Sequence, residues 1–205
     1  MKQTLFSAIV YLILCVSCTS NQMPLQLADT FSEGMVLQQK DQNNFWGQAP
    51  PSAEVTVEIQ EQKAVTRADA NGSWKTSLKD LKAGGPFTLK ITSDNASLTV
   101  HEVYVGEVWL ASGQSNMERR LSMSENGEQV VANANNTNIR FLLVPKISYE
   151  GQPIDKEMKW QTAIGPQVGD MSAVAYYFAE ELQAALNVPI GIICAYRGGI
   201  PAEAW

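Results

Sequence analysis

One serine, Ser115, has the surroundings of a catalytic nucleophile. The run 103–110 before it is apolar, β-branched and aromatic, which is typical of a buried strand, and the polar stretch 116–121 after it favours a helix. A strand that ends at the small residues 111–113 and continues as a helix leaves its turn at the carboxyl edge of a sheet, where α/β proteins hold their sites. The helix start would offer free N–H groups and a positive dipole end to a developing oxyanion.

The same serine also has a purely structural interpretation. Ser115 and Glu118 have the S-x-x-E spacing of a capping box, in which the serine only caps the following helix. Ester hydrolysis would further require a base that takes the serine proton and two or three hydrogen-bond donors at the oxyanion. The local spacing alone leaves both interpretations open.

The sequence contains one histidine, His101, and it is a poor candidate for that base. The expected strand 103–110 separates it from Ser115 by roughly 25 Å, at about 3.3 Å per residue. A general base must lie within about 3 Å of the hydroxyl, or one water away. We therefore interpret His101 as a linker or interdomain residue.

Composition and charge narrow the class of protein. The chain has 205 residues, of which 45% are hydrophobic and 18% charged, so it is long enough for one ordinary globular domain or two small ones. Its net charge of −6 argues against a nucleic-acid partner, because no basic stripe is available to neutralise phosphates.

The N-terminus has the pattern of an export signal. Lys2 precedes the apolar run 5–14, which is too short to span a bilayer. Val16-Ser17-Cys18 resembles the end of a bacterial lipoprotein cleavage box, although Cys15 stands where that box usually has leucine. We expect an exported periplasmic or outer-membrane (cell-surface) lipoprotein, with possible membrane anchoring through lipidated Cys18, and a plain secretory signal is the alternative.

Cysteine usage follows from that signal. Cys15 leaves with the signal and Cys18 lies at the cleavage site, so only Cys194 remains in the folded part and no internal disulfide can form. Because Cys194 lies in the apolar run 190–195, we interpret it as a small buried hydrophobic residue rather than a nucleophile.

Residues from 25 to about 100 read as short strands. Apolar segments alternate with turns, and in the stretch 55–60 apolar and polar residues alternate strictly, as in a strand with one solvated face. Asp69-Ala70-Asn71-Gly72 predicts a hairpin turn rather than a calcium loop, because the acidic ligand that should follow is missing. The spacing of these strands predicts a small β-sandwich.

The pattern changes after His101. A second strand is expected at 139–144, a third at 190–195, and between them a helix that Ser172 caps and Asn187 ends. Residues 122–138 and 145–170 read as a loop and as irregular structure. Strand, helix, strand in this order predicts a parallel α/β layer. The helix carries one apolar stripe, formed by Val174, Phe178, Leu182, Ala185 and Leu186.

Two blocks of this sequence resemble a known family. Gly106-Glu107-Val108-Trp109-Leu110 with Gly113-Gln114-Ser115-Asn116-Met117-Glu118 resembles the nucleophile block of the sialate O-acetylesterase family, a carbohydrate-esterase branch of the SGNH hydrolase superfamily. The stretches 189–193 and 198–205 resemble its second block. Further matches to the family's start and β-domain lie at 31–38, 46–47, 72–74 and 83–86.

The resemblance implies an α/β fold class, in which a small N-terminal β-sandwich domain is followed by an incomplete flavodoxin-like three-layer α/β (SGNH hydrolase) domain. The division that follows is a signal peptide with lipobox at 1–18, a tether at 19–24, the β-sandwich domain at 25–101, and the N-terminal part of the hydrolase domain at 102–205.

The resemblance also implies removal of O-acetyl groups from a sugar, either sialic acid or a plant polysaccharide, without metal or cofactor. Ser115 would be the nucleophile, and its N–H, with those of Gly198 or Gly199, would hold the oxyanion. Gln114, Asn116 and Arg197 would contact substrate. Where Arg197 stands the family usually has an uncharged, often aromatic residue, and where Ile200 stands it has a small polar one. Arg197 could bind a substrate carboxylate, such as that of a sialic acid, or be a solvated surface charge.

One departure concerns the base. In the family it is a histidine near the end of the catalytic domain with an aspartate just before it, and this chain ends at Trp205 before either. We therefore expect a truncated product or fragment with negligible esterase activity by itself. A non-catalytic carbohydrate-binding or scaffold lipoprotein relic and an acetylxylan esterase are the alternative functions.

Overall fold

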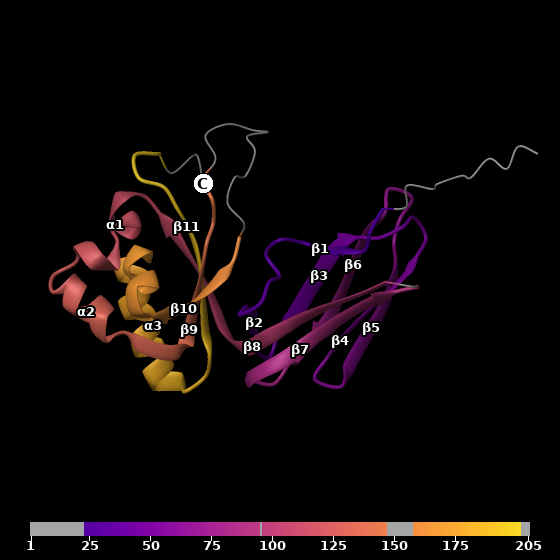
Figure 1. Ribbon diagram of the computed structural model, residues 1–205, viewed down its shortest axis with the longest axis horizontal. Coiled ribbons are helices and arrows are strands. Elements are labelled where there is room, and N and C mark those ends of the chain that lie inside the picture. Colours follow the sequence, from indigo (N-terminus) through magenta and orange to yellow (C-terminus); the bar gives the residue numbers. More distant parts are fainter. Residues whose placement is uncertain (1–22, 95, 147–157, 202–205) are drawn as a thin grey trace, which may run out of the picture.

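A computed structural model describes residues 23–94, 96–146 and 158–201. They form two lobes joined by one long strand, β8 (Ala96–Gly113), which runs from the first lobe into the second (Figure 1). Each lobe has its own cluster of buried hydrophobic side chains. β8 crosses the expected boundary between residues 101 and 102 without a break, and the division into domains stays a prediction. The expected signal peptide and Cys18 lie outside the described residues.

The N-terminal lobe consists of two packed layers of strands. One layer is the antiparallel sheet β1-β3-β6, made by β1 (Gln26–Leu27), β3 (Gln42–Gln48) and β6 (Ser73–Lys79). The other contains β4 (Glu54–Ile59), β5 (Gln62–Arg67), β7 (Gly84–Ser93) and the first half of β8. Side chains of both layers, among them Phe45, Trp74, Val57 and Leu89, fill the core between them.

Two local patterns in this lobe, the alternation along β4 and the turn after β5, were expected from the sequence. Val55, Val57 and Ile59 of β4 are buried, and the residues between them are not. The turn between β5 and β6 is closed by the Asp69 carboxylate, which accepts hydrogen bonds from the N–H groups of Asn71 at 2.8 Å and Ser73 at 2.9 Å. The expected turn is therefore present, but the prediction of a hairpin was wrong, because β5 pairs with β4 and β6 pairs with β3, so the turn connects the two sheets.

The second lobe is built on a mostly parallel sheet in the order β10-β9-β11-β8. The second half of β8 pairs in parallel with β11 (Ile190–Tyr196), and β11 pairs in parallel with β9 (Asn135–Leu143). At the outer edge, β10 (Trp160–Ile164) runs antiparallel to β9. The short strand β2 (Val36–Gln38) of the first lobe pairs with β8 at the junction. The expected α/β class is confirmed.

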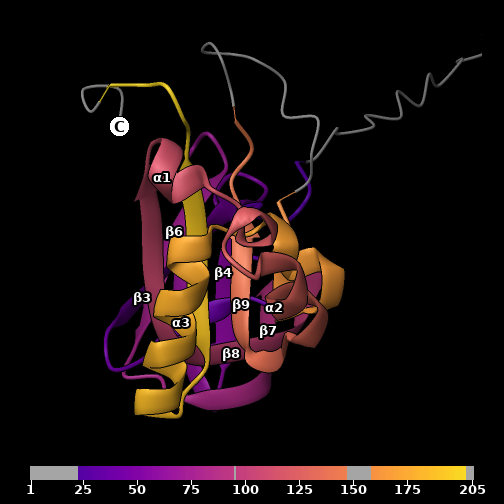
Figure 2. The same ribbon diagram turned by 90° about the vertical axis from the view of Figure 1, so that its left-hand side faces the viewer.

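Helices cover the face of this sheet that is turned away from the β-sandwich lobe (Figures 1 and 2). They are α2 (Gly127–Asn133), α3 (Ala173–Leu186) and the 3-10 turns η1 (Leu121–Met123) and η2 (Gly165–Asp170). Among the described residues, no helix is both long and apolar enough to cross a membrane.

Two stretches differ from expectation. Residues 122–138 are not a loop, because they contain most of η1, all of α2 and the start of β9. Asn126, in the left-handed region at φ 54°, precedes α2, and Val130 and Val131 pack against the core. A helix of two turns carries too few apolar residues for a recognisable period. Within 145–170, the described part forms β10 and η2, and residues 147–157 lie outside the described residues.

The expected helix at 172–187 is confirmed, but its buried face is a different one. The Ser172 hydroxyl accepts a hydrogen bond from the Ala175 N–H at 3.2 Å, and Asn187 ends the helix in the left-handed conformation. Much of the apolar stripe lies outward, since Val174 is 53% exposed and Phe178 41%, whereas Leu182 packs against the core. Instead, the residues Ala173, Ala175, Tyr176 and Ala179 face the core. The small alanines allow the helix to lie close to the sheet.

Candidate active site

Ser115 lies on an exposed turn at the carboxyl end of β8. The strand ends at Gly113, whose φ of 147° favours glycine, and the one-turn helix α1 (Ser115–Glu118) follows at Gln114. The expected strand–turn–helix is confirmed, although the helix is shorter than the expected stretch 116–121. Because α1 has a single turn, its dipole adds little, and free backbone N–H groups are its main resource.

The capping-box interpretation is not realised. Ser115 is the first residue of α1 rather than its N-cap, and its hydroxyl makes no hydrogen bond to any described residue. Glu118, which would reach back to the start of the helix in a capping box, instead directs its carboxylate across the sheet. The Ser115 side chain is therefore left available at the surface.

The end of β11 brings a glycine against this turn. Tyr196 pairs with Gly113, and the Arg197 N–H donates to the Gly113 carbonyl at 3.0 Å. Gly198 follows so closely that a Cβ added to it would lie 3.6 Å from the Ser115 Cα. The parallel pairing of β8 and β11 thus joins two segments that are far apart in the sequence.

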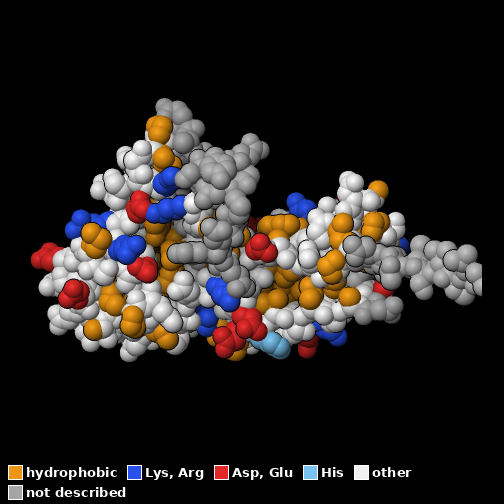
Figure 3. Space-filling model, turned by 45° about the horizontal axis from the view of Figure 1, so that its top comes forward, with side chains coloured by type: hydrophobic (Ala, Val, Ile, Leu, Met, Phe, Trp, Pro, Cys, Tyr) orange, Lys and Arg blue, Asp and Glu red, His pale blue; other side chains and the backbone are white. Residues whose placement is uncertain are grey.

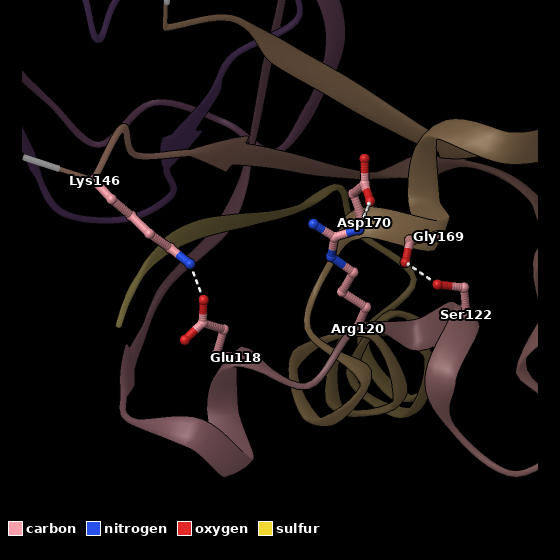
Figure 4. Close-up of polar contacts among 6 residues, drawn as sticks. All are labelled: Glu118, Arg120, Ser122, Lys146, Gly169 and Asp170. Carbon is pink, nitrogen blue, oxygen red and sulfur yellow. Dashed lines mark hydrogen bonds and ion pairs between the residues drawn. The ribbon is translucent and has the colours of Figure 1, made fainter. Parts of the chain in front are cut away.

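Glu118 ties these two segments together. One of its carboxylate oxygens, Oε2, accepts a hydrogen bond from the Gly198 N–H, and the other, Oε1, forms an ion pair with the Lys146 ammonium (Figure 4). The Gly198 N–H can therefore reach a substrate oxyanion only if Glu118 releases it. Gly199 has φ +78° and open space around its Cα.

Lys146 is a neighbour of the Ser115 turn that the sequence patterns did not indicate. It follows β9 and carries no local motif, so only the fold brings it to Glu118. Partial burial lowers the pKa of Lys146, and the charge of Arg197 lowers it further. The charges of Lys146 and Arg197 are therefore close enough to repel each other.

The chain that leaves α1 is fixed to the start of α3. Arg120 forms an ion pair with Asp170 at 3.2 Å, and the Ser122 hydroxyl donates to the Gly169 carbonyl at 3.0 Å (Figure 4). The Ala173 N–H also donates to the Arg119 carbonyl at 2.8 Å. These contacts hold the turn that carries Ser115 from its far side.

Three of the remaining candidate residues lie near Ser115, and His101 lies far from it. Gln114 and Asn116 are exposed on either side of Ser115, and Arg197 is half-buried beside it. Their contact with substrate stays a prediction. His101 lies in the N-terminal part of β8, roughly 40 Å along the strand from the turn that carries Ser115, so it does not take part in the site.

Cys194 lies beneath the site in β11 and is only 2% exposed. Burial raises the pKa of its thiol from 9.0 to about 12. At neutral pH the thiol is therefore protonated and unreactive. The interpretation of Cys194 as a small buried hydrophobic residue is confirmed.

Comparison with known proteins gives consistent relatives. No protein-family model matches the chain. It is 33% identical to human sialate O-acetylesterase over 200 residues, covering 88% of this chain and 38% of the human enzyme. It is 30% identical to the mouse sialate O-acetylesterase over 217 residues, covering 96% and 40%.

A solved structure gives the same answer. The fold matches a carbohydrate acetylesterase from Xanthomonas citri with a TM-score of 0.81 and 40% identity, covering 88% of this chain and 42% of that one. The resemblance found in the sequence is therefore confirmed, and the relatives are carbohydrate esterases. The chain spans about two fifths of the length of these relatives.

Proposed function

We propose that this chain carries the nucleophile of a carbohydrate O-acetylesterase. The observation that carries the proposal is the exposed Ser115 hydroxyl on the turn after β8, with Gly198, which follows β11, close against it. A serine with backbone donors beside it is the minimal arrangement for acyl transfer from an ester. The names of the relatives support acetylated carbohydrate as the substrate class.

The reaction divides into two steps. As a base takes the proton of the Ser115 hydroxyl, Oγ attacks the acetyl carbonyl carbon, and the carbonyl oxygen becomes an oxyanion held by the N–H groups of Ser115 and Gly199. When the oxyanion collapses, the bond between the acetyl carbon and the sugar oxygen breaks, and that oxygen takes up the proton from the base. Water then attacks the acetyl-serine and releases acetate. Both steps need a proton acceptor, and the described residues place no histidine near Ser115. Acylation by an activated ester should therefore be slow, and deacylation slower still.

Acetyl trapping tests this proposal on the chain itself. We expect incubation with p-nitrophenyl acetate, followed by peptide mass mapping, to show acetyl on Ser115, and added imidazole to speed its release by acting as the missing base. The exposed Ser112, three residues earlier on the same segment, is an internal control. Acetyl on Ser112 or on lysines only, with Ser115→Ala reacting like the wild type, would show that the turn is not a nucleophile site.

The substrate is the finer part of the proposal. With imidazole present, acetate release from O-acetylated sialic acid, compared with release from acetylated xylan, separates a sialate esterase from an acetylxylan esterase. Arg197, half-buried beside Ser115, favours the acidic sugar. Arg197→Gln should lower acetate release from the sialic acid and leave release from xylan unchanged.

A non-catalytic carbohydrate-binding or scaffold lipoprotein is the alternative from a different class. Sequencing the coding DNA beyond the codon for Trp205 discriminates between the two. An open frame with a D-x-x-H motif near its end supports the esterase, and a stop codon supports the relic.

We also propose export as a lipoprotein anchored through Cys18. Metabolic labelling with a radioactive fatty acid should mark the wild-type chain. The Cys18→Ala variant should be unlabelled, and equal labelling of both would exclude this anchor.

A further inference from the structure

Arg140 is a buried cation that has no carboxylate partner among the described residues. It lies in the middle of β9 and is 5% exposed. Its Nη1 donates to the Gly34 carbonyl at a long 3.5 Å, and its Cζ lies 3.9 Å from the centre of the Tyr104 ring. None of the ion pairs recorded between described residues includes Arg140, and its Nε has no hydrogen-bond partner.

A buried guanidinium in this state has unused capacity for an anion. Removing a charge from water is costly unless acceptors replace the lost hydration, and a ring contact with one long hydrogen bond replaces only part of it. The planar guanidinium has five N–H donors and binds carboxylates through two parallel hydrogen bonds. The geometry of Arg140 therefore favours a carboxylate that comes from outside the protein.

A cavity of about 440 Å³ gives such a group access to Arg140. It lies at the junction of the lobes, where Figure 3 shows acidic and basic side chains gathered on the surface. Its lining includes Arg140 and Ser32, whose Oγ is a second buried polar atom without a partner. The volume is in the range of ligand cavities in proteins.

The other lining groups indicate what kind of molecule carries the carboxylate. The exposed carboxylates of Glu33 and Glu102 line the same cavity, together with the exposed Lys159 and with Thr162. These carboxylates would repel a simple anion, but they accept hydrogen bonds from hydroxyl groups. A molecule with one carboxylate and several hydroxyls satisfies both parts of the lining.

We propose that this cavity binds a sugar that carries a carboxylate, as sialic and uronic acids do. The proposal rests on the proposed function for the choice of a carbohydrate. The carboxylate lies on Arg140, and sugar hydroxyls donate to Glu33 and Glu102. The site is separate from the nucleophile turn, because Arg140 is aligned through Gly191 with Val108, which precedes Gly113 by roughly 16 Å of strand. It is thus a second carbohydrate subsite.

Binding to the complete 205-residue chain tests the proposal without catalysis. The probes are galacturonic acid and galactose, which differ in whether C6 is a carboxylate or a hydroxymethyl group, together with N-acetylneuraminic acid and inorganic phosphate. We expect calorimetry or NMR titration to show both sugar acids binding at least about tenfold more tightly than galactose. Equal binding of galacturonic acid and galactose would overturn the proposal, and so would phosphate binding as tightly as the sugar acids.

Two variants locate the site. Arg140→Met should weaken galacturonic acid binding about tenfold or more and leave the weak binding of galactose unchanged. Because Arg140 is buried, Glu33→Gln at an exposed position provides a second test that does not endanger folding, and it should weaken both sugars. Glu54→Gln, at an exposed position of β4 outside the cavity lining, is the matched control and should bind like the wild type. Wild-type affinity of both Arg140→Met and Glu33→Gln would place the sugar elsewhere.

The outcome separates this subsite from the proposed esterase. Sugar-acid binding that needs Arg140, without acetyl trapping at Ser115, would retain the subsite and reject the esterase. Acetyl trapping without sugar-acid binding would do the reverse.

Discussion

Gly106 lies where β8 passes from one lobe to the other, and it has no room for a side chain. A Cβ added to it would lie 1.8 Å from the Pro189 carbonyl oxygen and 2.7 Å from the Pro189 carbonyl carbon. Ordinary contacts begin near 3.4 Å. Since both neighbours are backbone atoms, no rotation of a side chain relieves the clash, and Gly106→Ala must push the start of β11 away from β8 by about 1.5 Å.

The cost of this displacement follows from the contacts it breaks. The Glu107 N–H donates to the Pro189 carbonyl at 2.9 Å, and Ile190 pairs with Glu107 at the start of β11. Loss of one buried hydrogen bond costs about 1 kcal/mol, and overpacking adds roughly 1–3 kcal/mol. We expect Gly106→Ala to lower the free energy of unfolding by about 2–4 kcal/mol.

The same displacement should also change the position of Gly198 relative to the turn that carries Ser115. The register that starts at Ile190 and Glu107 continues to Tyr196 and Gly113, and it holds Gly198 against Ser115. Acetyl trapping at Ser115 should therefore slow in the variant under conditions in which it remains folded.

Urea unfolding followed by tryptophan fluorescence measures the effect. Gly169→Ala is the matched control, because its Cβ would meet only side chains of Val131 and Ser122, at 3.5–3.6 Å, and it should change the free energy of unfolding by less than about 0.5 kcal/mol. A Gly106→Ala variant as stable as the wild type would refute the reasoning. An equal loss in both variants would mean that the contact with Pro189 is not its cause, since the entropy of the unfolded chain by itself makes Gly→Ala stabilising.

Three further predictions concern the elements beneath the site. Burial raises the pKa of Cys194 from 9.0 to about 12, so its contribution to stability is complete below pH 9 and is lost as the pH rises toward 12, by up to about 1.4 kcal/mol per pH unit. Chemical unfolding of the wild type and of Cys194→Ala at several pH values should show that the difference between their free energies of unfolding becomes smaller as the pH rises. A constant difference would contradict this prediction. Ser172→Ala removes the hydroxyl that accepts the Ala175 N–H and should cost about 1 kcal/mol in a thermal melt, with Ser112→Ala as the unaffected control. At Asn187, in the left-handed region at φ 51°, alanine should cost about 1 kcal/mol and glycine should not; equal effects would mean that backbone strain is not the cause.

The position of the turn that carries Ser115 was predictable because its signals are local. An apolar strand that ends in small residues beside Gly113 and continues as a helix can be recognised within a short window. The meeting of Ser115 with Gly198 follows from one more rule, that parallel strands end at the same edge of a sheet. The glycine-containing segments that follow β8 and β11 were therefore expected to lie close together.

The contacts of Glu118 that hold this turn were not predictable in the same way. Glu118 stands three residues after Ser115, and that spacing alone suggested a capping box. Its actual partners, Lys146 and Gly198, are 28 and 80 residues away in the sequence. Such a pairing leaves no periodic or local signal, so it emerges only once β9 and β11 are placed beside β8.

The buried face of α3 shows a second limit of pattern reasoning. Period alone identifies an apolar stripe, but two faces of this helix can pack on a sheet, one formed by large apolar residues and one by alanines. The alanine face wins, and Phe178 turns outward to contact Trp109 edge-on at 5.2 Å. Trp109 and Leu110 of β8 are themselves 45% and 65% exposed, and among described strands only β11 pairs with this part of β8. The close packing of α3 on the sheet thus leaves large apolar side chains exposed. A hydrophobicity pattern does not predict this outcome, because it gives alanine little weight compared with larger apolar residues.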